Sequence, residues 1–516
     1  MLQDVSILTP LGIHAPAIGQ EQDGSERTYP EGSIIEQRQL HGVPRCWHHL
    51  SFRGIYEEMR ARTRTAWLHA YPWPGLVFAF CLVAWVVSIG LIGRGDGDNA
   101  NRSPLDEIMV VVLFGGWFLS GGPFPRRARP VVFAYATYIF LGCASAAFNG
   151  FGGYPKVLGT TVGALLELKW FIAGIGFMAL QRGRRSNESL KVVFRLTILL
   201  AVINSSCVIR DVYFSNGLDV FNEPMNSRGG RYSPHGFMPD KRTSCHLVVL
   251  AYAGCLAHGL ASRRSIYLLG CGAFLPILYL HNVATEMFAV IITTFVTLLV
   301  VSVRVLGRRR GMRFRLFMLA LVPVVALLAV SVAWTQLQAY IGSEYEDRVR
   351  TMMYVISYRI DVSFFPFGTG FGTFGSMPSR TLYWSPVYDH FDLSVLWGAT
   401  PRNAIFLMDV SWPKIFGETG LIGGFAFVYA LVVIFRCLAE RAQLEHSPES
   451  IFCLSLFVFF ILISISTSTF GTQQGVYALG YCVGFGLAPP RSDGPATEKS
   501  ALRNRRFARF AVPRNR

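Results

Sequence analysis

The sequence has few charged residues for its length. Of its 516 residues, 16% are charged and 52% are hydrophobic, whereas about a quarter of the residues of a typical soluble protein are charged. The apolar residues also occur in separated runs of about 17–24, each long enough to cross a hydrocarbon core of about 30 Å. This composition argues against a soluble fold and predicts a polytopic integral membrane protein.

Signals for other classes of protein are also missing. The ten cysteines show no paired spacing, so we expect neither a zinc site nor a disulfide framework. The first 65 or so residues are polar and contain no apolar segment typical of a signal peptide. We expect residues 1–68 to form a mostly disordered cytoplasmic tail, or in part to reflect a misplaced start codon. Six cysteines lie in apolar runs, where we expect small buried side chains: Cys81, Cys143, Cys255, Cys271, Cys453 and Cys482.

The net charge of +16 has two interpretations. A basic protein can bind nucleic acid, or it can be a membrane protein with arginines on its cytoplasmic side. The arginines lie at the ends of the apolar runs, and no basic surface interleaved with aromatic residues is apparent. We therefore favour the membrane and expect no nucleic-acid partner.

Hydropathy predicts an all-α integral membrane protein of about 12 transmembrane helices within residues 69–489. Every even-numbered connection is rich in arginine, whereas most odd-numbered connections are short and nearly free of positive charge. This pattern places both termini in the cytoplasm, including a basic tail at 490–516. The expected spans are roughly 74–93, 107–122, 131–149, 157–180, 190–213, 244–261, 265–280, 283–303, 315–336, 413–435, 451–468 and 472–488.

Two expected external loops are long and keep positive charge against this bias. They cover about 214–243 and 337–412, and we expect the second, between the ninth and tenth helices, to be partly helical. Two interpretations remain open for their arginines. The arginines pair with loop acids such as Glu344, Asp347 and Asp361, or they bind an anion, since the planar guanidinium fork suits phosphate.

The long loop contains a glycine-rich run, PFGTGFGTFG, at 366–375. Its glycines permit tight turns and close backbone approach, so a re-entrant turn is the simplest interpretation. The run is not a dinucleotide fingerprint, because no βαβ unit surrounds it. It is also not a phosphate-binding loop, because no Gly-Lys-Ser/Thr follows.

A second run, DVSWPKIFGETGLIGG at 409–424, opens the tenth expected span. Its glycines suit close helix packing. Glu418 is expected about one turn inside the membrane, where a carboxylate needs a partner, and a hydrogen bond to a neighbouring helix is the simplest one. Glu167 and Lys169 in the fourth span need partners elsewhere as well, because residues two apart on a helix do not face each other.

Taken in order, these features resemble the O-antigen polymerase and O-antigen ligase superfamily, and the Wzy-type exopolysaccharide polymerases most. The resemblance covers about 190–435 and depends on the arginine-bearing loops, the glycine-rich run and the Glu-x-Gly-Leu-Ile-Gly helix start. It implies one essential arginine in each loop. By position, Arg231 matches the first, with Arg228 and Arg210 as rivals, and Arg348 matches the second. We expect Arg231 and Arg348 to converge on one external cavity.

The sequence departs from the ligases, which place a His-Asn pair shortly before this helix start. Here Arg402-Asn403 lies too far upstream, and His281-Asn282 lies in a tight connection where helix capping is the simpler role. A polymerase is therefore favoured over a ligase. The catalytic base stays open among His390, Asp392 and Asp409, of which we favour Asp409. Further substrate contacts are expected from His390, Arg402, Ser411, Glu418, Gly370 and Gly372.

The resemblance implies a metal-independent glycosyltransferase of the bacterial inner membrane that needs no cofactor. Its substrates would be oligosaccharide repeat units on undecaprenyl diphosphate, with apolar helix faces binding the lipid. The two arginines would hold the diphosphate, and a carboxylate or histidine would accept the proton of the attacking sugar hydroxyl. A chain-length regulator and a flippase of the same pathway are implied partners. The alternatives are a ligase-type glycan transferase and a flippase or transporter, although transporters usually show internal repeats.

Overall fold

The computed structural model describes residues 77–83, 105–120, 124–148, 157–181, 186–215, 217, 227–228, 231–232, 234–238, 241–281, 283–306, single positions within 312–320, 345–404 and 406–489. All of them belong to one unit of the chain, Arg62–Arg516. The tails expected at 1–68 and 490–516 and nearly all of the expected ninth span lie outside these residues.

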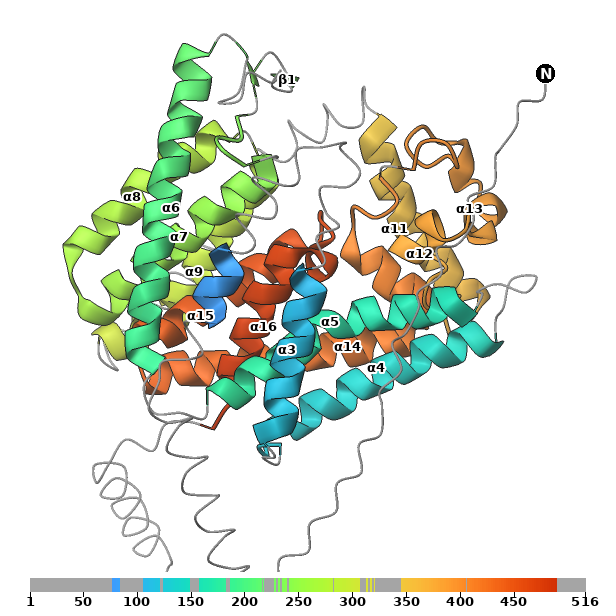
Figure 1. Ribbon diagram of the computed structural model, residues 1–516, viewed down its shortest axis with the longest axis horizontal. Coiled ribbons are helices and arrows are strands. Elements are labelled where there is room, and N and C mark those ends of the chain that lie inside the picture. Colours follow the sequence, from blue (N-terminus) through green and yellow to red (C-terminus); the bar gives the residue numbers. More distant parts are fainter. Residues whose placement is uncertain are drawn as a thin grey trace, which may run out of the picture. The chain divides into compact units, whose positions relative to one another are not determined.

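Helices occupy most of the expected spans (Figure 1). Six of the described helices are long and apolar enough to cross a membrane, and three more are apolar but shorter. The strands among the described residues form one short antiparallel pair, β1 (Ser227–Arg228) and β2 (Arg231–Tyr232). The helices at expected spans are α3 (Leu105–Ser120), α4 (Arg129–Phe148), α5 (Val157–Leu180), α6 (Ser186–Phe214), α7 (Lys241–Ser262), α8 (Ser265–Leu280), α9 (Ala284–Leu306), α14 (Ser411–Leu444), α15 (Pro448–Ile463) and α16 (Gln473–Leu487).

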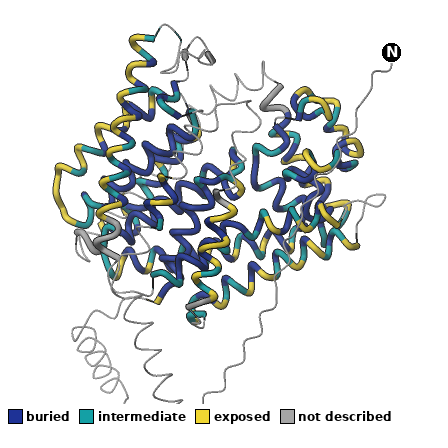
Figure 2. Tube along the Cα trace, viewed as in Figure 1, coloured by how far each residue is buried: buried dark blue, intermediate teal, exposed yellow. Residues whose placement is uncertain are grey.

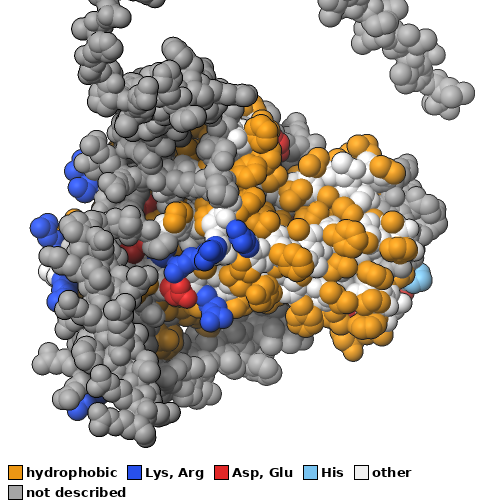
Figure 3. All heavy atoms as spheres, turned by 90° about the horizontal axis from the view of Figure 1, so that it is seen from below, with side chains coloured by type: hydrophobic (Ala, Val, Ile, Leu, Met, Phe, Trp, Pro, Cys, Tyr) orange, Lys and Arg blue, Asp and Glu red, His pale blue; other side chains and the backbone are white. Residues whose placement is uncertain are grey.

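Small residues allow several of these helices to pack closely. On α16, a β-carbon at Gly480 would press on Ala173 of α5, and one at Gly484 would clash with Phe177. Such small-residue contacts are typical of helices that associate within a membrane. On the outside, large apolar side chains of α4 such as Phe133 and Phe140 are exposed, and apolar side chains cover much of the face seen in Figure 3.

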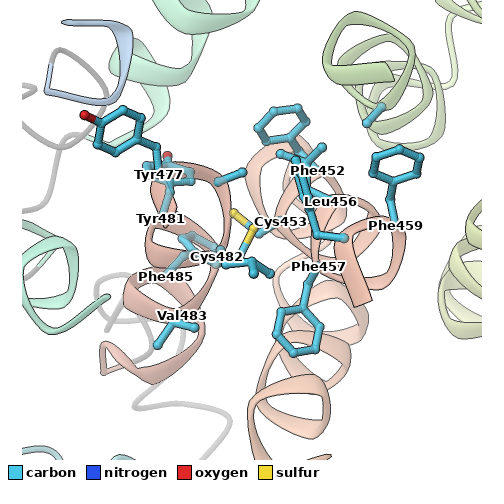
Figure 4. Packing of buried hydrophobic residues seen from close by; sticks show 14 of the residues in the cluster. Phe452, Cys453, Leu456, Phe457, Phe459, Tyr477, Tyr481, Cys482, Val483 and Phe485 are labelled. Atoms are coloured by element: carbon cyan, nitrogen blue, oxygen red, sulfur yellow. The ribbon is translucent and has the colours of Figure 1, made fainter. Parts of the chain in front are cut away.

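The interior is buried most continuously where α15 and α16 meet (Figure 2). Cys453 and Cys482 lie side by side there among aromatic rings that include Phe457 and Tyr481 (Figure 4). Both cysteines are free and buried, as expected. Cys143 was expected to be buried and is exposed instead. It lies on α4, which packs through the neighbouring positions Gly142 and Ser145, so its side chain points outwards.

The described part of the segment between α9 and α14 is partly helical, as expected, and has its own hydrophobic core. It contains α11 (Tyr345–Ser363), α12 (Met377–Thr381), α13 (Pro386–His390) and the 3-10 helix η3 (Leu393–Val395). We call residues 345–410 the cap. Its core is assembled from α11, the glycine-rich run and the later turns, and includes Val349, Met353, Ile356, Ile360, Phe374, Tyr388, Phe391 and Leu407.

The helix α14 is longer than the expected span 413–435 and is interrupted once. Gly420 has φ 70° and ψ 178°, which is not helical. The part after Gly420 is still about 36 Å long at about 1.5 Å per residue, enough to cross a membrane alone. Hydropathy ends the span early because polar residues follow position 435. The helix continues because its inner face stays buried, with Arg441 donating to Ala488 O at 3.0 Å and to Pro489 O at 2.7 Å.

Candidate functional site

The glycine-rich run packs between the ends of α4, α5 and α14. Gly370 and Gly372 have φ of 95° and 84°, which favours glycine. A β-carbon at Gly370 would clash with Ala146 of α4, and one at Gly372 with Gly159 of α5. The predicted tight turn with close backbone approach is therefore confirmed, and its entry into the membrane stays a prediction. Both glycines are buried between helices, where they hold the turn in place.

Backbone hydrogen bonds join this turn to the first part of α14. Thr369 N donates to Gly417 O at 2.9 Å, and Gly370 N donates to Glu418 O at 2.8 Å. These carbonyls are available because α14 breaks two residues later, at Gly420. The interruption of α14 thus frees the carbonyls that bind the glycine-rich turn of the cap.

The Glu418 carboxylate supports the same turn. Its Oε1 accepts hydrogen bonds from Thr373 N at 3.0 Å and Phe374 N at 3.1 Å. Only 1% of Glu418 is exposed, so these partners are needed. They belong to the backbone of the turn, whereas the sequence suggested a neighbouring helix.

Lys414 and Glu167 form an ion pair that joins α14 to α5. Tyr138 of α4 donates to Glu167 Oε2 at 2.9 Å, and Lys414 lies one turn before Glu418. We call Glu167, Lys414 and Glu418 the buried ionic network. Lys169 pairs separately with Glu107 of α3 at 2.6 Å. The prediction that Glu167 and Lys169 find partners on other elements is confirmed.

Arg350 of α11 forms an ion pair with Asp409, just before α14. Its Nη2 lies 2.6 Å from Asp409 Oδ2, and its guanidinium lies over the Phe406 ring at 5.9 Å. One of the two open interpretations was that loop arginines pair with loop acids such as Glu344, Asp347 and Asp361; Arg350 does pair with an acid, but with Asp409. The charge-assisted bond fixes both side chains, so Asp409 holds Arg350 in position.

The other residues selected from the sequence lie at the start of α14 and at different places on the cap. Ser411 donates to Thr467 O at 3.0 Å and holds the start of α14. His390 ends α13 with its ring edge-on to Phe391, and Asp392 follows in a left-handed conformation. His390, Asp392 and Arg402 are exposed on the surface of the cap, whereas Asp409 is close to α14. The three candidate bases therefore lie in different surroundings.

The loop between α6 and α7, the first of the two expected to be external, is described only in part. Arg228 and Arg231 pair through the backbones of β1 and β2, and their side chains lie outside the described residues, as does that of Arg348. The expected convergence of Arg231 and Arg348 stays a prediction. Arg210 lies near the end of α6, with Nη1 3.7 Å from Oδ1 of the buried Asp211. Asp211 Oδ2 in turn accepts from Gly236 N at 3.0 Å and fixes the end of that loop.

His281 caps α8, as the sequence suggested, because its Nδ1 lies 2.8 Å from Ile277 O. It also reaches α7, where Nε2 is 2.7 Å from Ser244 Oγ, and Ser244 accepts from Asn204 of α6 at 2.6 Å. Burial lowers the pKa of His281 to about 4, so the ring is neutral at physiological pH. Asn204 and Ser244 were not predicted from the sequence, because each lies in a short run of small polar residues within an apolar helix and nothing local distinguishes it.

An apolar groove of about 460 Å³ lies between α6 and α8. Its serines, Ser205 and Ser206, donate to carbonyls of their own helix, which leaves a surface suited to hydrocarbon. One end lies beside Ile209, next to Arg210, and the groove continues along Ile198, Val202, Ile266, Phe274 and Ile277.

Comparison with models of protein families finds no match for this chain, and comparison with curated proteins finds none either. Among the residues that the structure describes, no group of three or more His, Cys, Asp or Glu side chains is arranged to hold a metal ion.

Proposed function

We propose that this protein polymerises lipid-linked oligosaccharide repeat units. The observation that supports the proposal is the cap, a folded arginine-bearing segment attached to apolar helices. Its glycine-rich turn is held by Glu418, and its first helix is held by the Arg350–Asp409 pair. Such a structure suits a site built where membrane helices end, and it matches the order of features in the O-antigen polymerase and ligase superfamily.

In the proposed reaction, a sugar hydroxyl of one repeat unit attacks the anomeric carbon of a glycan on undecaprenyl diphosphate. The bond from that carbon to the diphosphate oxygen breaks, and undecaprenyl diphosphate leaves. Arg348 and Arg231 would offset the charge that develops on the diphosphate. Arg350 lies two residues after Arg348 on α11, and Asp409 would keep that helix in register with α14.

The proton of the attacking hydroxyl needs an acceptor. We keep His390, Asp392 and Asp409 as candidates, and the Arg350 pair gives Asp409 a positioning role as well. The lipid chain of the substrate would lie against apolar helix faces, and the groove between α6 and α8 has suitable chemistry.

The proposal includes a topology. The chain would cross the bacterial inner membrane twelve times with both termini in the cytoplasm, which places the cap at the outer face. A ligase-type transferase would use the same placement with a different acceptor. A chain-length regulator and a flippase of the same pathway would be partners.

A second candidate, a flippase or transporter, is favoured by one observation. The buried ionic network places two carboxylates and a lysine on α5 and α14, both apolar enough to cross a membrane. Buried ionisable residues of this kind are common in proton relays and transport pathways. The network also has a structural explanation, because Glu418 holds the glycine-rich turn.

One assay separates these functions. Purified protein in proteoliposomes is supplied with lipid-linked repeat units, without metal or nucleotide. We expect longer lipid-linked chains. Repeat units that only appear on the opposite side of the membrane would establish the flippase and refute the polymerase, and transfer to a separate acceptor glycan would establish the ligase.

A further inference from the structure

The helix α11 has two apolar faces, and only one of them packs into the cap. Val349, Met353, Ile356 and Ile360 are fully buried in the core of the cap. Tyr354, Val355, Tyr358 and Val362 are exposed. At about 100° per residue, these four cover an arc about 100° wide, a continuous stripe along the helix. An external loop surrounded by water would not be expected to expose such a stripe.

One end of this stripe, and the chain just beyond its other end, contact the ends of apolar helices. At one end, Tyr354 OH donates to Ile465 O at 2.6 Å, and Ile465 lies two residues after α15. At the other end, Phe365 follows α11, and the nearby Phe367 stacks on Phe148 with ring centroids 5.9 Å apart. Phe148 is the last residue of α4 and is itself exposed. The stripe therefore runs at the level where α4 and α15 end.

We propose that α11 is an interfacial helix whose stripe, Tyr354, Val355, Tyr358 and Val362, is inserted into the lipid at the outer surface of the membrane. Tyrosines are enriched at this depth, because the ring can lie in the apolar region while the hydroxyl finds a polar partner, which for Tyr354 is Ile465 O. Arg359 is exposed beside the stripe and can contact anionic headgroups. The occupant is lipid, because Phe367, just beyond the stripe, stacks on Phe148 of α4, a helix whose large apolar side chains are exposed.

This placement deepens the proposed function and rests on its topology, but not on its chemistry. Arg348 and Arg350 lie in the first turns of the same helix. An α11 held in the interface keeps them at the depth of the headgroups, where the diphosphate of a membrane lipid is found. The cap would then receive its substrate along the membrane surface.

Spin labels on neighbouring residues test the proposal. Val362 is in the stripe, whereas Ser363 is exposed about 100° further around the helix. Val362→Cys and Ser363→Cys are made in a protein whose Cys46, Cys143 and Cys207 are replaced by serine, then labelled and placed in nanodiscs of anionic phospholipid. Collisions with oxygen, which concentrates in lipid, are compared with collisions with a water-soluble nickel chelate.

We expect the oxygen-to-nickel ratio to be several-fold higher at position 362 than at 363. Equal ratios, with nickel reaching both labels, would overturn the proposal by placing the stripe in water. A label at 362 shielded from both reagents would also overturn it, because a protein partner would then cover the stripe. A high oxygen-to-nickel ratio at position 362, together with no polymer in the proteoliposome assay, would support the interfacial helix and refute the proposed function.

Discussion

Arg350 and Asp409 fix α11 against the start of α14 through one ion pair. Asparagine at position 409 keeps the shape of the side chain but removes the charge, and lysine at 350 removes the planar fork. We expect Asp409→Asn and Arg350→Lys each to lower polymer formation about tenfold, because small displacements of a positioned group slow a transfer strongly. Arg359→Lys, the same change at an exposed site on the same helix, should leave polymer length and yield unchanged. Full activity in both variants would show that the Arg350–Asp409 pair has no role in the reaction.

Asp361 is a buried acid on α11, and its Oδ1 has no hydrogen-bond partner in the described part of the chain. Burial raises the pKa of Asp361 to about 7. The folded protein therefore holds a proton that the unfolded chain releases, so the stability contributed by the neutral acid is lost as pH rises from about 4 to about 7.

Asp361→Asn should imitate the neutral acid at every pH. We expect its melting midpoint in detergent to exceed that of the wild-type protein by several degrees at about pH 8, and by much less at about pH 4.5. Asp389→Asn, at an exposed acid of the cap, is the control. A constant difference between Asp361→Asn and wild type across this range would mean that residue 361 keeps an ordinary pKa.

For buried charged residues, the sequence predicts that a partner exists but not which residue it is. A charge in an apolar helix signals that a partner exists, and Glu167 and Lys169 both have one. The identity of the partner depends on which helices touch and in what register, and Lys414 and Glu107 lie far from them in the sequence. Arg350 was one of several loop arginines, and nothing local distinguished it before Asp409 was seen beside it.

The helix α14 is interrupted at Gly420, where it packs against the glycine-rich run. A β-carbon at Gly420 would clash with Pro366 and Phe367 of the glycine-rich run, and its φ of 70° disfavours other residues. We expect Gly420→Ala to destabilise the protein by about 2 kcal/mol or more, from strain and the clash together, and to expose the cap to proteolysis. Gly116→Ala on α3, whose β-carbon meets nothing within 4 Å, should have little effect. A normal melting midpoint and a protected cap in Gly420→Ala would contradict the role given to this residue.

The groove between α6 and α8 can be filled without touching the cap. Ala273 lines the groove, and Leu269, one turn away on α8, is exposed elsewhere. If the groove holds the lipid chain, Ala273→Trp should raise the KM for the lipid-linked donor about tenfold and leave kcat unchanged, because ground-state and transition-state binding fall together. Leu269→Trp should match wild type. Equal kinetics in the two variants would show that the lipid binds elsewhere.

Hydropathy predicted which helices are present better than it predicted where they begin and end. The apolar runs that gave α3 to α9 and α14 to α16 are long, and a membrane helix needs little beyond length and composition. The extension of α14 to Leu444 depends on contacts with the end of α16, and its break depends on the cap. Both are tertiary effects that no local pattern contains. The turn at 366–375 could be predicted because several glycines within so few residues are typical of tight turns.

At the scale of the whole molecule, everything proposed for the cap requires that it lie outside the cytoplasm. Five arginines gather between residues 308 and 315, and such short basic connections remain inside. We expect alkaline phosphatase fused after Arg380 to be active and the same enzyme fused after Arg310 to be inactive, because it folds only outside the cytoplasm, where its disulfides form. Green fluorescent protein at the same two sites should give the opposite pattern, which controls for expression. Activity at 310 and none at 380 would put the cap in the cytoplasm, where no substrate displayed on the outer face could reach its arginines.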